Sequence, residues 1–292
     1  MFTWQQALAE YSRTEIATQL RHGAWQRVLR GVYRTAEVDP TGQARVIAAQ
    51  LSMNVHAAAA CHDTAAQLHG FAVLEAPDIH VLCRAARRTR AAGLVVHRAE
   101  FHSADVVQVG SVWATTPART AVDLARTYSR LDAIALLDAA LRSGVARSAL
   151  WAELDRQVGN RGVRQAAALI PLADGRAQSP MESRTRLRCI DAGLPRPEPQ
   201  LEVRVGNSVR FLDLGWRDHK VGLEFESGEW HTGVAAATRD NPRHNLLVDD
   251  GWLMFYAIGS QVYRQPQAFT EPVRRAIVRR ELERAVVHGE SA

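Results

Sequence analysis

Four carboxylates in the last third of the sequence have the spacing of an acidic metal-binding cluster. Asp213 lies at the end of one predicted strand, and Glu224 and Glu226 lie two residues apart on the next. Residues two apart on a strand project from the same face, so both glutamates can converge with Asp213. Glu182, on the preceding predicted helix, could join them. Oxygen ligands suit Mg²⁺, which in a nuclease activates water and stabilises charge on the scissile phosphate.

The cluster departs from the usual nuclease pattern at one position. Glu226 stands where the D…E-x-K pattern has a lysine, and a further carboxylate repels the phosphate that a lysine would stabilise. Four residues downstream could complete an acid/base site or form ordinary surface ion pairs: His231, Arg239, Asp240 and Arg243. Three interpretations stay open: an active hydrolytic site with Asp213 and Glu224 as metal ligands, a retained scaffold without activity, and unrelated surface charges. We expect no catalysis.

The histidines lack the spacing of a metal site. His56, His62 and His69 lie six and seven residues apart in an alanine-rich stretch, and His97 and His102 flank a predicted strand turn. Metal sites on a single helix often use histidines four residues apart. We therefore expect no cofactor, with Mg²⁺ as the exception if the nuclease interpretation holds.

The cysteines and the hydropathy pattern point to a soluble cytoplasmic protein. Cys61, Cys83 and Cys189 are far apart and form no C-x-x-C pair, which favours neither a disulfide framework nor a thiolate zinc site. The N-terminus lacks a basic stretch followed by a long apolar run. No segment approaches the 18 apolar residues of a membrane span, so we expect no membrane partner.

The first 38 residues predict a winged helix-turn-helix. Ser12 and Glu15 form an S-x-x-E capping box, which starts a helix at Ser12, and Gly23 is a stop signal. A shorter helix precedes it and ends near Tyr11. Alternating apolar and basic residues around Gly31 then predict a two-stranded wing.

This unit carries the candidate DNA-binding residues. The second helix of such a unit lies in the major groove, and basic wing residues contact phosphates. The base-contacting candidates are Arg13, Thr14, Thr18 and Arg21, and the backbone-contacting candidates are Arg27 and Arg30. Residues 1–36 hold five arginines against two glutamates, which favours double-stranded DNA as the partner. The alternative is a small helical module that packs against another protein.

The overall charge agrees with a polyanionic partner but does not identify one. The formal net charge is +5, and every basic residue among the 36 except Lys220 is arginine. A GC-rich coding genome would also favour arginine. A guanidinium nevertheless binds phosphate or guanine through two hydrogen bonds, whereas an ammonium acts as a point charge.

The chain is predicted to be an α+β multidomain protein. We expect a DNA-binding domain at residues 1–38, an α+β middle domain at 44–173 and an α/β restriction-endonuclease-like layer at 179–292. Residues 44 to about 70 are predicted to be helical. The strands expected next are 79–83, 93–98 and 106–115, and the helices after them are 117–125, 131–141, 148–158 and 163–172.

The last region has its own order of elements. We expect a helix at 180–192, strands at 201–205, 209–216 and 221–226, a helix at 238–250, a strand at 252–258, and a basic helix from Glu271. On this last helix Val273, Ile277, Leu282 and Val286 form an apolar stripe that predicts docking on the sheet.

The sequence resembles the AbiEi-type antitoxins over nearly its whole length. The residues that carry the resemblance are Gly31-Val32-Tyr33, Ala65-Ala66 with Leu68-His69-Gly70, Val96-His97-Arg98, Thr116-Pro117-Ala118-Arg119-Thr120-Ala121-Val122-Asp123-Leu124, Ser179-Pro180-Met181-Glu182 and Gly193-Leu194-Pro195-Arg196-Pro197. The last third resembles a family related to very-short-patch-repair endonucleases, with matching positions at Asp213, Glu224, Glu226, His231, Asp240 and Arg243.

The resemblance implies an antitoxin of a type IV toxin–antitoxin pair. Such an antitoxin is encoded beside a nucleotidyltransferase toxin, represses the shared promoter by binding inverted repeats, and neutralises the toxin through the region after the winged unit. The alternatives are a metal-dependent DNA endonuclease that uses the C-terminal carboxylates and a plain transcriptional regulator.

Overall fold

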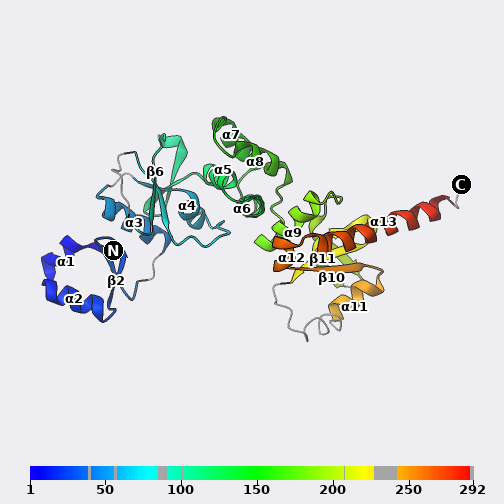
Figure 1. Cartoon of the computed structure of the whole chain (residues 1–292), viewed down its shortest axis with the longest axis horizontal. Helices are drawn as coiled ribbons and strands as arrows, with labels where there is room; N and C mark the ends of the chain where they lie inside the picture. The colour runs from blue at the N-terminus through cyan, green and yellow to red at the C-terminus, as the bar shows by residue number, and fades with distance from the viewer. Residues whose placement is uncertain are drawn as a thin grey trace. The chain divides into compact units, whose positions relative to one another are not determined.

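The chain builds three β-sheets in the part that the structure describes, and these belong to two units (Figure 1). The computed structural model describes residues 1–38, 41–55, 58–84, 91–99, 101–206, 208–226 and 242–289. The first unit comprises Met1–Tyr128 and Ser143–Ile170, and the second comprises Ser129–Arg142 and Pro171–Ala292. None of the helices among these residues is long and apolar enough to cross a membrane.

The N-terminal elements lie where the capping pattern predicted them. Strand β1 (Phe2–Thr3) and helices α1 (Trp4–Glu10) and α2 (Arg13–Arg21) precede the hairpin of β2 (Trp25–Leu29) and β3 (Val32–Thr35). The capping box is confirmed, because the Glu15 amide donates to the Ser12 Oγ at 3.3 Å and the Ser12 amide donates to the Glu15 carboxylate at 2.8 Å. The three strands pair in the order β1-β3-β2.

The hairpin shares a core with the elements that follow it. Ile16 and Trp25 form a small core with Ala7 beneath the helix pair. Leu29 and Val32, on the hairpin, instead belong to a core that also contains Ala48, Ala49, Ala58, Ile79, Val81, Cys83 and Leu94. The hairpin is therefore held by apolar burial from the five-stranded sheet as well as by its own helices.

A five-stranded sheet forms the centre of the first unit. Its strands are β4 (Ala59–Ala60), β5 (Ile79–Leu82), β6 (Leu94–His97), β7 (Val106–Val109) and β8 (Val112–Thr115), in the order β6-β5-β4-β8-β7. Helices α3 (Gly42–Met53) and α4 (His62–Leu68) lie on either side of β4 in the sequence. The prediction of continuous helix from 44 to about 70 is therefore wrong.

The helix prediction fails because the alanine run is buried in the middle of the sheet. Ala58, Ala59 and Ala60 are at most 2% exposed, and the pair Ala59–Ala60 is hydrogen-bonded between β5 and β8. Small side chains let neighbouring elements approach the central strand closely. Tertiary burial overrides the helix propensity of alanine here.

Three helices pack together beside this sheet. They are α5 (Pro117–Thr127), α7 (Arg147–Arg156) and α8 (Val163–Leu169), and a 3₁₀ turn at Ser103–Asp105 precedes β7. Thr116 caps α5, and Pro117 occupies its first turn. Gly162 has φ +84, and a Cβ there would lie 2.1 Å from the carbonyl oxygen of Arg126, so only glycine allows this approach of α8 to α5.

The second unit is a four-stranded sheet covered by helices. Its strands are β9 (Glu198–Val205), β10 (Ser208–Trp216), β11 (Val221–Glu226) and β12 (Leu253–Ile258), in the order β12-β11-β10-β9. Only the β11–β12 pair is parallel among these. The helices are α6 (Arg130–Arg142), α9 (Pro180–Asp191), α11 (Pro242–Asp249), α12 (Gly259–Arg264) and α13 (Gln267–Gly289). The four predicted strands of this region are confirmed.

A buried ion pair joins α6 to α9. The Arg186 guanidinium donates to both carboxylate oxygens of Asp138, at 3.0 and 2.8 Å, and to the carbonyl oxygen of Leu172 at 2.6 Å. Both charged side chains are almost fully buried. Helix α6 therefore belongs with the C-terminal sheet although α5 and α7, its neighbours in sequence, belong to the first unit.

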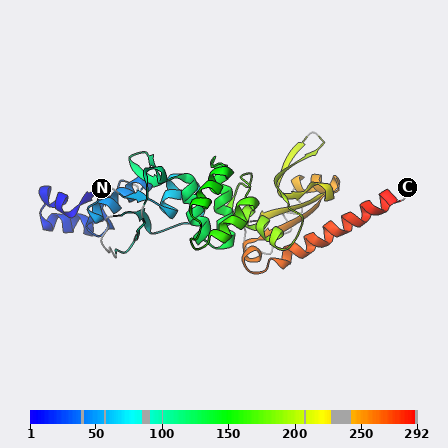
Figure 2. The ribbon, with the colours of Figure 1, turned by 90° about the horizontal axis from the view of Figure 1, so that it is seen from above.

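Helix α13 docks on the sheet through its first half. Val273 and Ile277 are buried in the core, whereas Leu282 and Val286 are 63% and 60% exposed. The predicted stripe is thus correct for the first half and wrong for the second. A helix of 23 residues is about 35 Å long, whereas a strand of six residues spans only about 20 Å, so the helix extends beyond the sheet (Figure 2).

Candidate functional site

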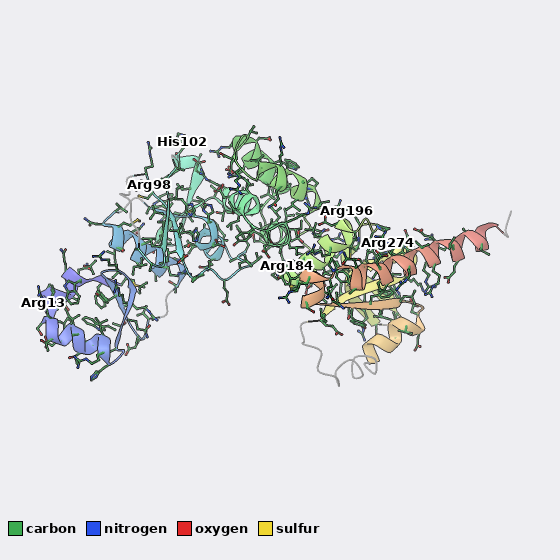
Figure 3. The ribbon with its side chains drawn as sticks, viewed as in Figure 1. Arg13, Arg98, His102, Arg184, Arg196 and Arg274 are labelled. Atoms are coloured by element: carbon green, nitrogen blue, oxygen red, sulfur yellow. The ribbon has the colours of Figure 1, made fainter. Side chains whose placement is uncertain are left out.

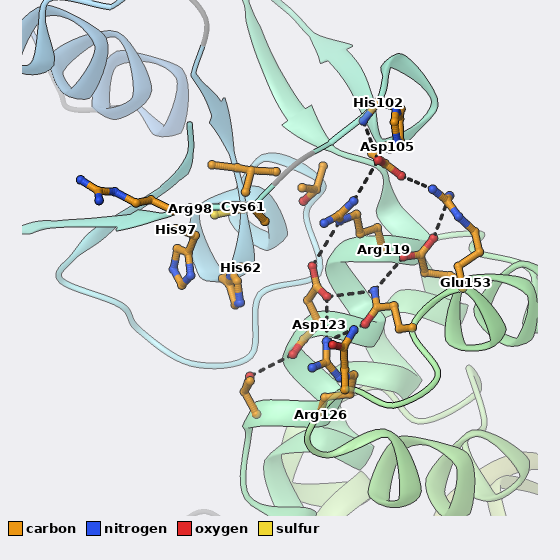
Figure 4. Close-up of a pocket in the computed structure, with 17 residues that line it drawn as sticks. Cys61, His62, His97, Arg98, His102, Asp105, Arg119, Asp123, Arg126 and Glu153 are labelled. Atoms are coloured by element: carbon orange, nitrogen blue, oxygen red, sulfur yellow. Dashed lines mark hydrogen bonds and ion pairs between the residues drawn. The ribbon is translucent and has the colours of Figure 1, made fainter. Parts of the chain in front are cut away.

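A polar pocket of about 480 Å³ lies in the first unit (Figure 4). Helix α5 supplies one wall with Arg119, Asp123 and Arg126, which share a helix face because they lie four and three residues apart. Helix α7 supplies a second wall. The start of α4 and the end of β6 supply the wall that carries Cys61 and His97.

Charged side chains on two walls of the pocket are bound to one another. Arg119 lies 3.1 Å from Asp105 and 3.5 Å from Asp123, and Arg156 binds both Asp105 and Glu153. Burial raises the pKa of Asp105, but hydrogen bonds from His102 and Arg156 and the charge of Arg119 outweigh it, so the pKa lies below its ordinary value. Asp105 is therefore a fixed anion between two helices.

Gln157 joins the charged groups of α5 to those of α7. Its side-chain amide donates to Asp123 at 2.9 Å and to Glu153 at 2.7 Å, and it accepts from Arg126 at 2.6 Å. Burial raises the pKa of Asp123, although Arg119 and Gln157 act in the opposite direction. The network fixes the arginine side chains, so this wall of the pocket is rigid.

Three histidines from separate elements meet on the opposite side. The rings of His62 and His97 stack with centroids 4.0 Å apart, and His80 Nδ1 lies 3.0 Å from His97 Nε2. Burial, followed by the charges of His97 and His80, lowers the pKa of His62 to about 3. Burial also lowers the pKa of His80 and of His97. All three imidazoles are therefore neutral near pH 7, and each has one unprotonated ring nitrogen whose lone pair can bind a metal ion or accept a hydrogen bond.

Cys61 completes this group. It is fully buried between β4 and α4, and burial raises the pKa of its thiol. Within the described ranges, Cys61, His62 and His97 form a group whose ligand atoms all lie within 4.8 Å of one another. This is the combination that could hold a metal ion.

The predicted DNA-binding residues lie at the surface of the N-terminal elements. Arg13 and Thr14 are exposed in the first turn of α2, and Arg21 is exposed in its last turn. Thr18 is half-buried, and its hydroxyl donates to the carbonyl oxygen of Thr14 at 2.9 Å. Figure 3 shows Arg13 at the outer edge of the helix pair.

The two wing residues are also exposed. Arg27 donates to the carbonyl oxygen of Leu29 at 3.3 Å, and Arg30 precedes Gly31 in the turn of the hairpin. The structure thus places all six candidates on two neighbouring elements, α2 and the β2–β3 hairpin.

The C-terminal carboxylates are only partly brought together. The antiparallel register Leu214↔Leu223 puts Asp213 opposite Glu224, and Asp213 accepts the amide of Phe225 at 2.9 Å. Among the described residues, no three of Glu182, Asp213, Glu224 and Glu226 bring one carboxylate oxygen each to within 4.8 Å of the other two.

Glu182 is engaged elsewhere. It is buried in the first turn of α9 and accepts the amide of Gln178 at 2.9 Å and the side-chain amide of Gln200 at 2.8 Å. This carboxylate is therefore bound to the segment before α9 and to β9, while Ser179 caps the helix. Predicted residues His231, Arg239 and Asp240 and the side chain of Arg243 lie outside the described residues.

The pocket was not predicted from the sequence, although the spacing of two of its charged residues was visible there. The T-P-A-R-T-A-V-D-L run carries Arg119 and Asp123 four residues apart on one helix face. No comparable signal marked His62, His80 and His97, because they come from α4, β5 and β6 and meet only when the sheet forms.

Comparison with known proteins identifies relatives of the whole chain and of this region. Residues 58–174 match the family model described as the AbiEi antitoxin C-terminal domain. Two proteins of Mycobacterium tuberculosis, from strains CDC 1551 and H37Rv, are each 39% identical to the chain over 280 residues. The alignment covers 95% of this chain and 100% of each relative, and both relatives are described as uncharacterized proteins.

Proposed function

The chain belongs to one family with these mycobacterial proteins and carries an AbiEi antitoxin domain at residues 58–174, and from this premise we propose that it is a DNA-binding antitoxin. It neutralises a nucleotidyltransferase toxin encoded beside it and represses their shared promoter. The match of residues 58–174 to the antitoxin domain is the observation that carries the proposal. The protein acts in the cytoplasm, where its three free cysteines stay reduced.

The N-terminal elements support the DNA-binding half of this proposal. Two short helices followed by a hairpin are the parts of a winged helix-turn-helix, whose second helix enters the major groove. Exposed Arg13 and Arg21 lie at opposite ends of α2, and neither side chain has a hydrogen-bond or ion-pair partner in the described part of the chain. Their guanidinium groups are therefore available for base edges or phosphates.

The C-terminal unit acts as an endonuclease-like scaffold without catalysis. Its order of elements, helix α9, three strands, helix α11 and strand β12, supports the likeness to such enzymes. The Glu182 carboxylate is bound by Gln178 and Gln200, and Glu226 replaces the lysine that would stabilise the phosphate. Incubation with duplex DNA and Mg²⁺ or Mn²⁺ tests this, because nicking that Asp213→Ala abolishes would favour the nuclease alternative instead.

Growth rescue tests the antitoxin proposal. The neighbouring nucleotidyltransferase is expressed in a host with and without this chain, and a toxin inactivated in its own active site serves as the control. We expect the toxin to arrest growth and the full chain to restore it. A plain transcriptional regulator would be favoured if no nucleotidyltransferase gene lay beside this one and the chain did not restore growth.

A further inference from the structure

We propose that Cys61, His62 and His97 form a binding site for a zinc ion on the wall of the pocket in the first unit. The site has three protein ligands and one open position that faces the pocket. The ligands lie within the antitoxin domain at residues 58–174, but the argument for the site uses neither DNA binding nor toxin neutralisation.

The geometry of the three ligand atoms supports this site. They lie within 4.8 Å of one another, whereas a tetrahedral zinc ion places its sulfur and nitrogen ligands about 3.4 to 3.6 Å apart, as follows from bond lengths of about 2.3 and 2.1 Å. The rings of His62 and His97 are stacked, with centroids 4.0 Å apart and planes inclined by 16°, so at least one ring must turn for both in-plane nitrogen lone pairs to point at one ion.

One ring nitrogen of His62 has no hydrogen-bond partner among the described residues. This atom, Nδ1, is buried. A buried polar atom without a partner is rare in a folded protein and calls for an explanation such as a bound ion or water. A zinc ion would accept its lone pair directly.

His80 supports the ligand role of His97. Its Nδ1 lies 3.0 Å from His97 Nε2, so this contact occupies one ring nitrogen of His97 and leaves Nδ1 for the metal. Metal-binding histidines are usually oriented in this way by a hydrogen bond at the other nitrogen. We therefore assign His80 as a positioning residue.

The backbone holds the two adjacent ligands in an unusual conformation. Cys61 is the extended residue that precedes α4, and His62 has φ +49, a value that side-chain-bearing residues rarely adopt. The backbone conformation changes between the two residues, and both side chains lie near His97 at the end of β6. Such backbone positions concentrate at functional sites, where the surrounding structure maintains them.

The donor set selects zinc over magnesium. A thiolate and two imidazoles are soft or borderline ligands, which Mg²⁺ does not favour. Three protein ligands with one open position are typical of zinc sites that hold water or an external group. Cys61 and both histidines line the pocket, so its approximately 480 Å³ supplies room for that fourth ligand.

Charges around the site are mixed. Asp63 and Asp123 favour a cation near Cys61, whereas Arg119 and Arg126 act against one near His62. Both arginines are bound to Asp123, which reduces their repulsion. The bound metal must also displace the thiol proton of Cys61, so its affinity rises with pH.

Cobalt substitution tests the site in the full-length protein. Chelator-treated protein is titrated with Co²⁺, whose coordination to a thiolate in a tetrahedral site gives a charge-transfer band and intense visible bands. We expect both bands at stoichiometric Co²⁺, and we expect Zn²⁺ to remove them by competition. Absence of the charge-transfer band in the wild-type protein would overturn the proposal.

Matched variants identify the ligands. Cys61→Ser should abolish the charge-transfer band, whereas Cys83→Ser and Cys189→Ser, at two other buried cysteines, should retain it. His97→Gln should weaken Co²⁺ binding more than His80→Gln, for which we expect a loss of about 10- to 100-fold, as for other residues that orient a ligand.

A pocket histidine outside the ligand group supplies the last control. His102→Gln should bind Co²⁺ as the wild-type protein does. Circular dichroism of each metal-free variant checks that it is folded. If Cys61→Ser does not fold, a Zn²⁺-dependent rise in the melting temperature of the wild-type protein that His97→Gln loses would support the site, and its absence would overturn it.

Discussion

The arginines of the N-terminal elements and those of the pocket are the same residue type in opposite environments. Arg13, Arg21 and Arg30 are exposed, and their guanidinium groups have no hydrogen-bond or ion-pair partner in the described part of the chain. Arg119 and Arg126 have side chains only 16% and 15% exposed, and each is bound to a carboxylate. The guanidinium groups of the first set are available to another molecule, whereas those of the second set bind carboxylates inside the fold.

The contrast between exposed and carboxylate-bound arginines shows that arginine content alone does not locate a nucleic-acid surface. A guanidinium that is paired with buried carboxylates stabilises the protein, and removing it leaves charges uncompensated. An exposed guanidinium contributes little to stability but binds phosphate or guanine strongly. Substitutions in the two regions should therefore separate stability from DNA affinity.

The largest effect on stability is expected at Arg119. We expect Arg119→Ala to lower the free energy of unfolding by about 3 kcal/mol, the lower end of the range for a broken buried pair, because Arg126 and Arg156 still neutralise Asp123 and Asp105 in part. Urea denaturation measures this. Arg21→Ala is the matched control and should change stability by less than about 0.5 kcal/mol. Equal losses in the two variants would remove the distinction between the regions.

The next effect concerns DNA affinity at Arg13. We expect Arg13→Ala to weaken binding to the promoter by about 1–3 kcal/mol if its guanidinium contacts a guanine edge, with stability nearly unchanged. Gel-shift titration with the upstream duplex and with a shuffled duplex measures the affinity and the preference. A variant that binds the promoter as tightly as the wild-type protein would contradict the assignment of α2.

A smaller effect is expected at the cap of α2. Ser12→Ala removes the hydroxyl that accepts the Glu15 amide, so the free energy of unfolding should fall by about 1 kcal/mol. Ser12→Asn keeps an acceptor at this position and should retain most of the stability. If both variants unfolded at the same urea concentration as the wild-type protein, the cap would not stabilise this helix.

The smallest effect is expected at Arg30. Because Arg30 lies in the turn of the hairpin, its loss should weaken binding to all duplexes alike. The slope of log affinity against log salt concentration should become shallower by about one unit, the contribution of one phosphate contact. A change in sequence preference would instead show that the hairpin reads bases.

Local signals in the sequence predicted much of the fold. Ser12 and Glu15 marked the start of α2, and proline after Ser179 marked the start of α9, because caps depend only on neighbouring residues. The four strands of the second unit followed from their alternating or apolar pattern. Ala59 and Ala60 were predicted wrongly, because their strand exists only through pairing with β5 and β8.

The site was harder to predict than the fold. Arg119 and Asp123 are close in sequence and share a helix face, so their pairing was within reach of pattern reasoning. His62 and His97 are 35 residues apart and become neighbours only through the order of the five strands. Spacing along one helix cannot reveal a group whose members come from a helix start and a strand end.

Binding of the full chain to the DNA upstream of its own gene tests the central claim most directly. Fluorescence anisotropy compares the wild-type protein with an Arg13→Ala, Arg21→Ala double variant, on the upstream duplex and on a shuffled duplex at one salt concentration. We predict that the wild-type protein prefers the upstream duplex and that the double variant loses at least about tenfold in affinity for it while unfolding at the wild-type urea concentration. A double variant that binds the upstream duplex as the wild-type protein does would contradict the account.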